Sequence, residues 1–322
     1  MGFLRMQVRV FYHDRCFDGA CSAALFSSYV RRNFAPSAEI VRTGLFHRAE
    51  QLFDESLFDS DVHAIVDFKY SPSDRVTWWF DHHQSAFLSE ADADHYRCDT
   101  SGRKFYDAGY KSCTKFIADI LSEKFAFDSS HMKRLIYWAD IIDGAQYESA
   151  KSAIEMAHAA MKLTLIFESA EQNVTNAVIP LLETESFEDI VGRPEYASVF
   201  EQLFERHMRS IDVIRERAEY RDGVVYFDLV DTKLAGYNKF VPYYLFPEST
   251  YTVSVLDGGF RSKISVGSNP WSRSDPDHNL ADLCESYGGG GHARVGAISY
   301  GANEFERARA TAAEIVAKLS SA

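Results

Sequence analysis

The sequence predicts an α/β protein with two domains: an N-terminal domain built on a parallel sheet and a smaller C-terminal α/β domain. Three observations support this. Apolar, β-branched runs alternate with helix-like segments over the first half of the chain. These runs carry no polar face, which is typical of parallel strands covered by helices. The 322 residues, 46% of them hydrophobic, are ample for more than one packed core.

The elements of the N-terminal domain follow one another closely, and we place this domain at residues 1–190. Each predicted strand is short, apolar and bounded by polar or turn residues. Strands are predicted at 6–13, 38–44, 63–68 and 76–80, and helices at 20–32, about 109–126 and 130–142.

A long amphipathic segment joins this domain to the rest of the chain. Apolar residues recur at i, i+3 and i+4 spacing in this segment, which predicts a connecting helix within 191–222. The remainder, 223–322, contains strand-like runs at 224–230, 251–257 and 260–267. The last two are separated by Gly258-Gly259, as in an antiparallel hairpin. A short helix, a glycine loop leading into a strand, and a closing helix complete this domain.

Composition argues against several classes of protein. The net charge is −13, so we expect neither long duplex DNA nor a membrane surface as a partner. The five cysteines are irregularly spaced and form no C-x-x-C pair, which argues against a disulfide framework and against a zinc ribbon. No apolar run reaches transmembrane length and no secretory signal is evident, so a cytoplasmic location is predicted.

Aspartate and histidine recur where the predicted strands end, and again near the end of a predicted helix. A single such residue is usually a cap or a turn residue, but the coincidence of several is harder to explain in that way. Since ligands bind beyond the carboxyl ends of parallel strands, these groups are expected to meet at one edge of the sheet. They are His13, Asp18, Asp67, Asp81, His82, His83, Asp140 and Asp143.

This mixture of carboxylate and imidazole predicts a divalent metal site. Such ligands suit Mn²⁺, Fe²⁺, Co²⁺ or Zn²⁺ better than Mg²⁺, which prefers oxygen ligands. We expect Mn²⁺, in one or two sites. Two ions bridged by a carboxylate lower the pKa of the attacking water and withdraw charge from phosphoryl oxygens, which predicts cleavage of phosphate esters.

The same motifs, taken in order, resemble the DHH phosphoesterase family. Asp81-His82-His83 follows an apolar strand, Asp67 lies upstream, and Asp18-Gly19 fits the family's first motif. The run GGGGHARVGA, 288–297, is similar to the glycine-rich signature of the DHH-associated C-terminal domain. The resemblance extends over essentially the whole chain. It implies a metal-dependent phosphoesterase whose second domain binds the rest of the substrate.

The resemblance also implies roles for individual residues. Asp67 would bridge two ions, Asp81 would orient its neighbours, and His83 would face the scissile phosphate as a donor or acid. In the fourth motif the resemblance favours Asp140, with Asp143 as the alternative. The implied metal ligands are Asp18, Asp67, His82 and Asp140.

The first motif departs from the family pattern, because Cys16 stands where a ligating aspartate is common. An extended strand end would put Asp14, Cys16 and Asp18 on one side and His13 on the other. Three interpretations stay open: Cys16 binds metal as a thiolate, His13 reaches the second ion because a turn breaks the alternation, or only one ion binds tightly. A buried thiol with no ligand role is equally compatible with the sequence.

The glycine run predicts a loop of backbone N–H groups open to an anion, although a plain flexible turn is the simpler interpretation of four glycines. The resemblance implies a substrate-binding motif, in which His292 bonds a phosphate or terminal group and Arg294 adds charge. Further candidates in the same domain are Arg261, Lys263 and Arg273. The motif residues are Gly289, Gly290, Gly291, His292 and Arg294.

These observations lead us to expect hydrolysis of a phosphodiester or phosphomonoester of a short oligonucleotide or nucleotide. Two alternatives are kept. One is a pyrophosphate or polyphosphate hydrolase, and the other is a non-catalytic nucleotide-binding module. A homodimer is compatible with the sequence, which does not fix the oligomeric state.

Overall fold

The computed structural model describes residues 5–46, 53–232, 234, 236–272 and 276–320. The chain divides into two compact units. The first comprises residues 1–147 and 157–203, and the second comprises 148–156 and 204–322. Each unit is described by itself. None of the helices in the described part of the chain is long and apolar enough to cross a membrane.

The first unit is built on a five-stranded sheet with the order β2-β1-β3-β4-β5, in which every neighbouring pair is parallel. The predicted parallel α/β domain is thereby confirmed. Its strands are β1 (Gln7–His13), β2 (Glu39–Leu45), β3 (Val62–Val66), β4 (Val76–Asp81) and β5 (Lys104–Tyr106). Its helices are α1 (Phe17–Tyr29), α2 (Glu90–Arg97), α3 (Cys113–Phe125), α4 (Lys133–Asp143), α6 (Ala159–Ser169), α7 (Gln172–Val178) and α8 (Phe187–Val191).

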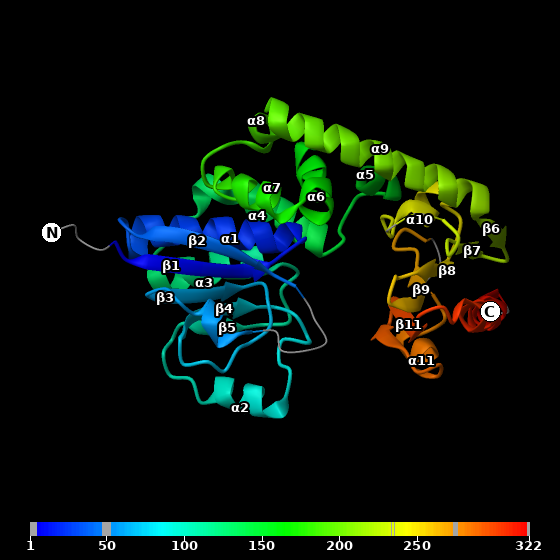
Figure 1. Cartoon of the computed structure of the whole chain (residues 1–322), viewed down its shortest axis with the longest axis horizontal. Helices are drawn as coiled ribbons and strands as arrows, with labels where there is room; N and C mark the ends of the chain where they lie inside the picture. The colour runs from blue at the N-terminus through cyan, green and yellow to red at the C-terminus, as the bar shows by residue number, and fades with distance from the viewer. Residues whose placement is uncertain (1–4, 47–52, 233, 235, 273–275, 321–322) are drawn as a thin grey trace. The chain divides into compact units, whose positions relative to one another are not determined.

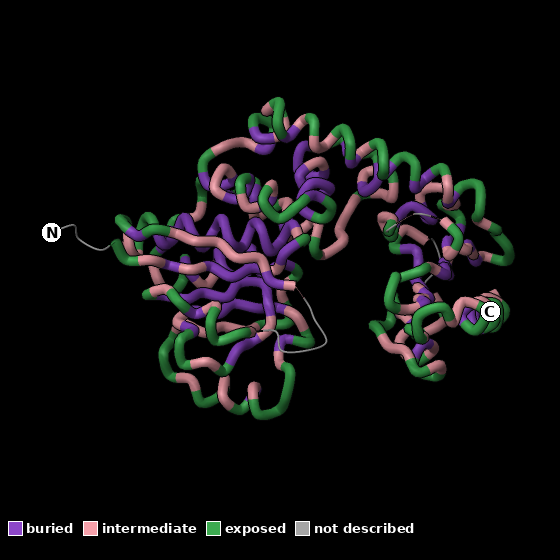
Figure 2. Tube along the Cα trace, viewed as in Figure 1, coloured by how far each residue is buried: buried purple, intermediate pink, exposed green. Residues whose placement is uncertain are grey.

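The two faces of this sheet are filled by alternating side chains of the same strands, as the pleat requires. On one face Trp78 packs edge-to-face on Phe26 of α1, with 5.6 Å between ring centroids. On the other face its neighbour Trp79 packs on Tyr70 at 4.7 Å and on Tyr96 of α2 at 5.2 Å. Both tryptophans are fully buried, and Figure 2 shows the strands as a largely buried layer.

Helix α2 and strand β5 were not predicted from the sequence. Helix α2 is almost entirely polar and buries Ala93 alone among its residues, so it has no apolar periodicity to recognise. Strand β5 has three residues and lies at the edge of the sheet. The remaining differences are at the ends of elements; α1, for example, begins at Phe17 rather than at residue 20.

The carboxyl ends of the three central strands meet at one edge of the sheet. Tyr12 pairs with Val66, and Val66 pairs with Phe80. The next residues along these strands are His13, Asp67 and Asp81, which therefore come side by side. Helix α1 starts directly beyond β1 and lies alongside it (Figure 1).

A glycine allows this close start. A Cβ atom on Gly19 would lie 2.1 Å from the carbonyl oxygen of His13, a separation that no real side chain tolerates. Any larger residue would push the first turn of α1 away from the end of β1. The close approach of α1 to the end of β1 therefore explains why glycine follows Asp18.

The second unit holds a six-stranded mixed sheet with the order β10-β11-β9-β8-β7-β6. Only the β7–β8 pair is parallel among these strands, and the hairpin predicted around Gly258-Gly259 is confirmed as β8–β9. The strands are β6 (Glu219–Arg221), β7 (Val224–Asp228), β8 (Tyr251–Asp257), β9 (Arg261–Ser268), β10 (Gly290–His292) and β11 (Val295–Gly301). The helices are α5 (Ala150–Ile154), α10 (Val241–Leu245), α11 (Leu280–Glu285) and α12 (Phe305–Ser320).

Helix α9 (Pro194–Arg217) corresponds to the predicted connecting helix, and its residues are divided between the two units after Leu203. In the second unit, α11 and α12 cover one face of the mixed sheet. Ile264, Val266 and Ile298 of the sheet pack there against Leu280 of α11 and Ile315 of α12.

The predicted open glycine loop is wrong for part of its length. Gly290–His292 forms strand β10, which pairs antiparallel with β11. The glycines are needed for this close pairing, because a Cβ atom on Gly291 would lie 2.2 Å from the carbonyl oxygen of Val295. A Cβ atom on Gly289 would lie 2.3 Å from the carbonyl oxygen of Ala297. A strand that begins with glycines has no apolar side chains there, so the sequence pattern does not predict it.

Candidate metal centre

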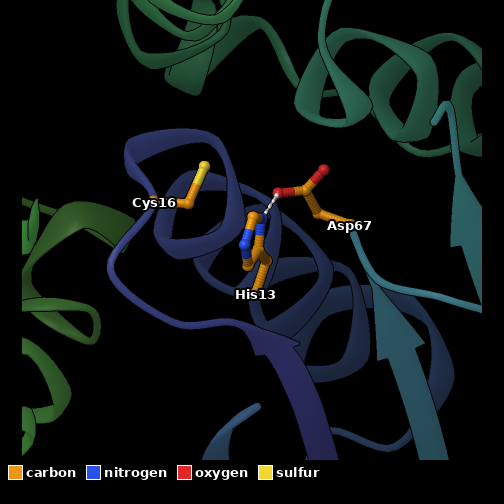
Figure 3. A group of neighbouring side chains, drawn as sticks. All are labelled: His13, Cys16 and Asp67. Carbon is orange, nitrogen blue, oxygen red and sulfur yellow. Dashed lines mark ion pairs between the residues drawn. The ribbon is translucent and has the colours of Figure 1, made fainter. Parts of the chain in front are cut away.

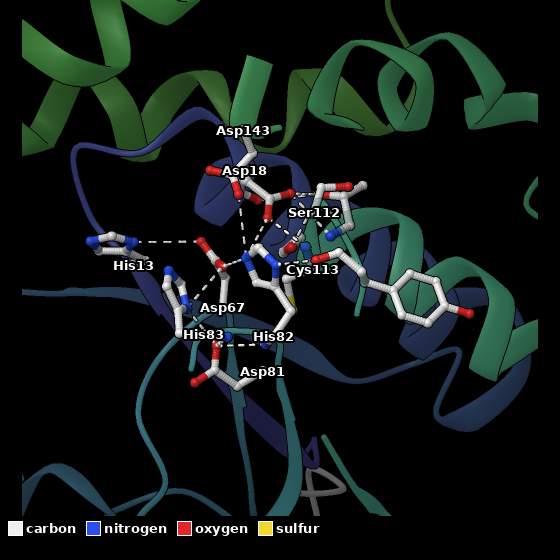
Figure 4. Close-up of polar contacts among 12 residues, drawn as sticks. His13, Asp18, Asp67, Asp81, His82, His83, Ser112, Cys113 and Asp143 are labelled. Carbon is white, nitrogen blue, oxygen red and sulfur yellow. Dashed lines mark hydrogen bonds and ion pairs between the residues drawn. The ribbon is translucent and has the colours of Figure 1, made fainter. Parts of the chain in front are cut away.

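Potential metal ligands of the first unit gather at the carboxyl edge of the parallel sheet (Figure 4). Within each of three overlapping groups, the ligand atoms lie within 4.8 Å of one another. Asp67 belongs to two of the groups and His82 belongs to two. The groups are His13 with Cys16 and Asp67, Asp67 with His82 and His83, and Asp18 with His82 and Asp143.

Asp67 lies at the centre of this arrangement. Its φ of 56° is in the left-handed region, which is uncommon for a residue other than glycine. Its Oδ1 atom lies 3.4 Å from His82 Nε2, and its Oδ2 atom lies 3.6 Å from His13 Nδ1. Burial disfavours the carboxylate, but the surrounding histidines outweigh this effect and hold the pKa of Asp67 below its usual value.

The ring of His82 is held in one orientation. Its Nδ1–H group donates to the carbonyl oxygen of Tyr110 at 3.0 Å, which leaves Nε2 as the nitrogen directed at the carboxylates. Nε2 lies 3.3 Å from Asp143, 3.4 Å from Asp67 and 3.7 Å from Asp18. Burial alone would lower the pKa of His82, but the nearby carboxylates, Asp67 first, raise it to about 10. A cation at Nε2 would be stabilised by the same charges.

Asp81 supports the neighbouring histidine. Its Oδ1 atom accepts hydrogen bonds from His83 Nδ1 at 2.6 Å and from the backbone N–H groups of His82 and His83. Burial opposes the charged form of His83, yet the bond with Asp81 and the charge of Asp67 raise the pKa of His83 to about 9. The His83 side chain is 32% exposed, whereas Asp81 is fully buried.

Asp18 joins the first turn of α1 to the start of α3. Its carboxylate accepts hydrogen bonds from the backbone N–H groups of Cys113 and Thr114, at 2.6 and 3.0 Å, and from the Thr114 hydroxyl. Asp18 does not cap α1, because it lies inside that helix and binds the N-terminus of α3. Burial, followed by the charges of Asp67 and Asp143, raises the pKa of Asp18.

The two candidate aspartates of α4 differ in position. Asp143, the last residue of α4, directs its carboxylate at His82 Nε2, and burial with the charge of Asp67 raises its pKa to about 6. Asp140 accepts a hydrogen bond from the Ser112 hydroxyl at 3.2 Å. Ser112 also caps α3. Among the described residues, the groups that could hold a metal include Asp143 and leave out Asp140.

The first motif turns instead of running on as an extended strand, so the expected alternation of Asp14, Cys16 and Asp18 is wrong. Arg15 has a φ of 55°, and α1 begins two residues later. This turn brings His13 and Cys16 to the same side as Asp67 (Figure 3). Burial and the nearby carboxylates raise the pKa of the Cys16 thiol.

The residues at this edge fit a divalent cation. Both carboxylate oxygens of Asp67 and Nε2 of His82 are buried, and none of these three atoms has a hydrogen-bond partner in the part of the chain that the structure describes. Buried polar atoms of this kind are costly unless they bind something. Imidazole and carboxylate donors suit Mn²⁺, Fe²⁺, Co²⁺ or Zn²⁺. The backbone contact of His82 through Nδ1 is typical of metal-ligating histidines.

Sequence reasoning missed the contact that orients His82. Tyr110 holds the His82 ring through its backbone carbonyl oxygen. Every residue has such a carbonyl, so the contact cannot be predicted from the residue type. The tight turn at Asp67 was missed for a similar reason, because an aspartate in a sequence does not indicate whether its φ is left-handed.

The other predicted site residues belong to the second unit. His292 and Arg294 are exposed at the β10–β11 hairpin, and Gly290 and Gly291 are in β10 itself. Lys263 is half-buried in β9, and burial lowers its pKa. Arg261 donates to the hydroxyl of Ser299. Arg273 lies outside the described residues.

No family model and no curated protein sequence matches the chain. Among solved structures, the chain is similar to the pGpG-specific phosphodiesterase PggH from Vibrio cholerae, with 18% sequence identity and a TM-score of 0.67 over 97% of this chain and 99% of that one. It is also similar to RecJ from Thermus thermophilus, solved in complex with Mn²⁺. Here the identity is 12% and the TM-score 0.57, over 97% of this chain and 52% of that one. The resemblance drawn from the motifs is confirmed at the level of the fold.

Proposed function

We propose that this chain, which has the fold expected of a DHH phosphoesterase, is a metal-dependent hydrolase of a phosphate ester in a short oligonucleotide or nucleotide. One observation carries the proposal: His82 Nε2 and the two oxygens of Asp67 are buried at the same strand edge with unmet bonding capacity. His82 Nε2 lies 3.4 Å from Asp67 Oδ1, close enough for both atoms to bind one cation.

The residues that would hold the metal are Asp18, Asp67, His82 and Asp143, with His13 and Cys16 as candidates for a second site. Divalent ions bound there would supply Lewis acidity, which lowers the pKa of the attacking water and withdraws charge from the phosphoryl oxygens. We propose Mn²⁺ as the ion. The donor types support this choice, and the similar RecJ structure contains Mn²⁺.

The chain's own residues would do the rest of the chemistry. Although burial opposes the charged ring, the bond with Asp81 and the charge of Asp67 raise the pKa of His83, which favours its protonated form. With Nδ1 engaged by Asp81, its other ring nitrogen, Nε2, is left to donate to a phosphoryl oxygen or to the leaving group. Asp81 would fix the orientation of this donor without contacting the substrate. Asp18 would act as a ligand and, through its bonds to α3, as a rigid support.

A short nucleotide-like substrate agrees with the net charge of −13, which disfavours long polyanions. His292 and Arg294 are the groups we propose for its other end. The name of the similar Vibrio protein supports a diribonucleotide with a 5′-phosphate, pGpG, as the first substrate to test. A cytoplasmic location and a homodimer stay predictions from the sequence.

A substrate panel tests the proposed function. The purified chain would be incubated with pGpG, adenosine 3′,5′-bisphosphate, a bis-aryl phosphodiester and pyrophosphate, each with added Mn²⁺ and with EDTA. We expect Mn²⁺-dependent turnover of at least one ester and none with EDTA. Turnover of pyrophosphate alone would favour the phosphoanhydride hydrolase instead. No turnover of any compound would favour a non-catalytic module.

A further inference from the structure

The two carboxylate oxygens of Asp67 face different halves of the metal centre. Oδ1 lies 3.4 Å from His82 Nε2, whereas Oδ2 lies 3.6 Å from His13 Nδ1. The Asp67 side chain is 1% exposed, and neither oxygen has a hydrogen-bond partner among the described residues. A carboxylate placed in this way can bind one cation through each oxygen. The two halves can therefore be compared by their remaining ligands.

These remaining ligands differ in their chemistry. In the first half, the donors that the described residues offer are carboxylates and imidazoles: Asp18, Asp67, His82 and Asp143. The second half adds a sulfur atom, because Cys16 joins His13 and Asp67 there (Figure 3). The ligand atoms of these three residues lie within 4.8 Å of one another. Thiolate is a soft ligand that favours Zn²⁺, whereas carboxylates also suit Mn²⁺.

The turn before α1 brings the Cys16 thiol to this position. Arg15 has a φ of 55°, and the turn places the side chains of His13 and Cys16 on the side of Asp67. Cys16 is the N-cap residue of α1, yet within the described chain its side chain makes no capping hydrogen bond. The thiol is therefore not engaged by the helix that it precedes. The N-terminal end of this 13-residue helix also favours a negative charge on the sulfur.

The other four cysteines are placed differently. Among the described residues, only Cys16 belongs to a group of possible metal ligands. Cys113 lies beside the same centre, since its backbone N–H group donates to Asp18. Its thiol, however, donates to the carbonyl oxygen of Phe80 at 3.5 Å. Cys113 is therefore a thiol of the same region with a partner of its own, which makes it a matched control.

The spacing of the second half fits a tetrahedral ion. Metal–ligand bonds of about 2.0–2.3 Å place neighbouring ligands roughly 3.3–3.8 Å apart. The 3.6 Å between His13 Nδ1 and Asp67 Oδ2 agrees with this spacing. Burial raises the pKa of the Cys16 thiol, which opposes a thiolate without a positive partner. A divalent ion supplies that partner: the S–H bond breaks, a metal–sulfur bond forms and the proton goes to solvent.

We propose that His13, Cys16 and Asp67 bind a thiophilic divalent ion of the Zn²⁺ type, while the other half of the centre binds Mn²⁺. This inference rests on the proposed function, since it names the ion for each half of that centre. Asp67 is shared by both ions, and Cys16 determines the difference between the halves. Three protein ligands leave a fourth position open, as in catalytic rather than structural zinc sites.

Optical spectroscopy with Co²⁺ tests the sulfur ligand without any turnover. Co²⁺ substitutes for Zn²⁺, and a cobalt–thiolate bond gives a strong charge-transfer band in the near ultraviolet. Protein freed of metal with EDTA and then exchanged into buffer is titrated with Co²⁺. We expect the band in the wild type and in Cys113→Ala, and its loss in Cys16→Ser and Cys16→Asp. Serine and aspartate are favoured N-cap residues, so both substitutions suit the start of α1.

A metal competition tests the selectivity. Wild type and Cys16→Asp are equilibrated with a large excess of Mn²⁺ over a buffered, low concentration of Zn²⁺, and the bound metals are analysed. The wild type should hold both ions. Cys16→Asp offers oxygen in place of sulfur and should hold Mn²⁺ alone. Equal Zn²⁺ content in the two proteins, or a cobalt band that survives in Cys16→Ser, would overturn the inference.

The substrate panel judges the proposed function separately. A wild type that shows the cobalt band but hydrolyses nothing would overturn the proposed function alone. A wild type that hydrolyses an ester with Mn²⁺ but shows no cobalt band would overturn the thiolate site alone.

Discussion

The Nε2 atom of His82 lies 3.4 Å from Oδ1 of Asp67, while its Nδ1–H group donates to the carbonyl oxygen of Tyr110 on the opposite side of the ring. The backbone bond occupies Nδ1, so Nε2 is the nitrogen that faces the carboxylate and can bind a metal cation in place of a proton. The two residues come from the ends of β3 and β4, and the register of these parallel strands brings them together.

The two aspartates of α4 should respond differently to removal of their charge. Asp143→Asn should lower turnover by more than the roughly 10- to 100-fold that loss of an outer partner of a metal ligand costs. Asp143 faces His82 Nε2 directly, and an amide is a poor replacement for a carboxylate ligand. Asp140→Asn keeps an acceptor for the Ser112 hydroxyl and should change turnover less than 10-fold. Steady-state kinetics of the two variants checks this, and the reverse order of effects would assign the ligand to Asp140.

Asp81→Asn should reduce kcat without removing metal. The variant weakens the bond that orients His83 and removes the charge that raises the pKa of that ring. We expect kcat to fall roughly 10- to 100-fold. The alkaline limb of the pH profile should move to lower pH, because His83 then loses its proton more readily. Metal analysis and a pH–rate profile on the same sample test both parts. A loss of bound metal would instead make Asp81 a ligand.

Gly19→Ala should destabilise the first unit. The added Cβ atom would meet the carbonyl oxygen of His13 at 2.1 Å, so α1 must move away from the end of β1. A cost of about 1–3 kcal/mol is expected for such overpacking. Urea denaturation followed by circular dichroism measures it. Gly236→Ala is the matched control, because a Cβ atom there has no atom within 4 Å. Equal denaturation midpoints for the two variants would contradict this account.

His207 should make the stability of the chain depend on pH. Its Nε2–H group donates to the carbonyl oxygen of Ile154, and burial lowers its pKa below the ordinary 6.5. The folded state then binds a proton less readily than the unfolded state. The contribution is full above pH 6.5 and is lost as the pH falls below that value. We expect the denaturation midpoint to fall more between pH 7.5 and 5.5 in the wild type than in His207→Gln. Equal falls would exclude this role for His207.

Much of the first unit follows from its sequence. Strands that are apolar on both faces predicted the parallel sheet, and the rule that ligands bind at carboxyl strand ends predicted that Asp18, Asp67 and His82 meet. That His13 joins them was one of three open interpretations. Asp140 and Asp143 could not be separated in this way, because residues three apart lie on nearly the same face of a helix. The choice between them depends on where α4 ends relative to His82, which is a matter of tertiary packing.

The second unit was less predictable where backbone contacts decide the structure. The glycines of β10 were interpreted as a loop, yet they form a strand that pairs with β11. Glycine is needed at Gly291 because β11 comes too close there for a side chain. The position of Trp271 depends on Asn269, whose side chain binds carbonyl groups of a distant turn. Neither contact has a sequence pattern of its own.

The most direct test of the metal-dependent phosphoesterase is metal content and turnover measured on the same preparations of wild type and Asp67→Asn. Asparagine tolerates the left-handed φ of 56° at this position, so the variant changes the charge and leaves the backbone as it is. The account predicts bound divalent metal and Mn²⁺-stimulated hydrolysis of pGpG or the aryl diester in the wild type, with both lost in Asp67→Asn. A variant that keeps its metal and its turnover, or a wild type that shows neither, would contradict it.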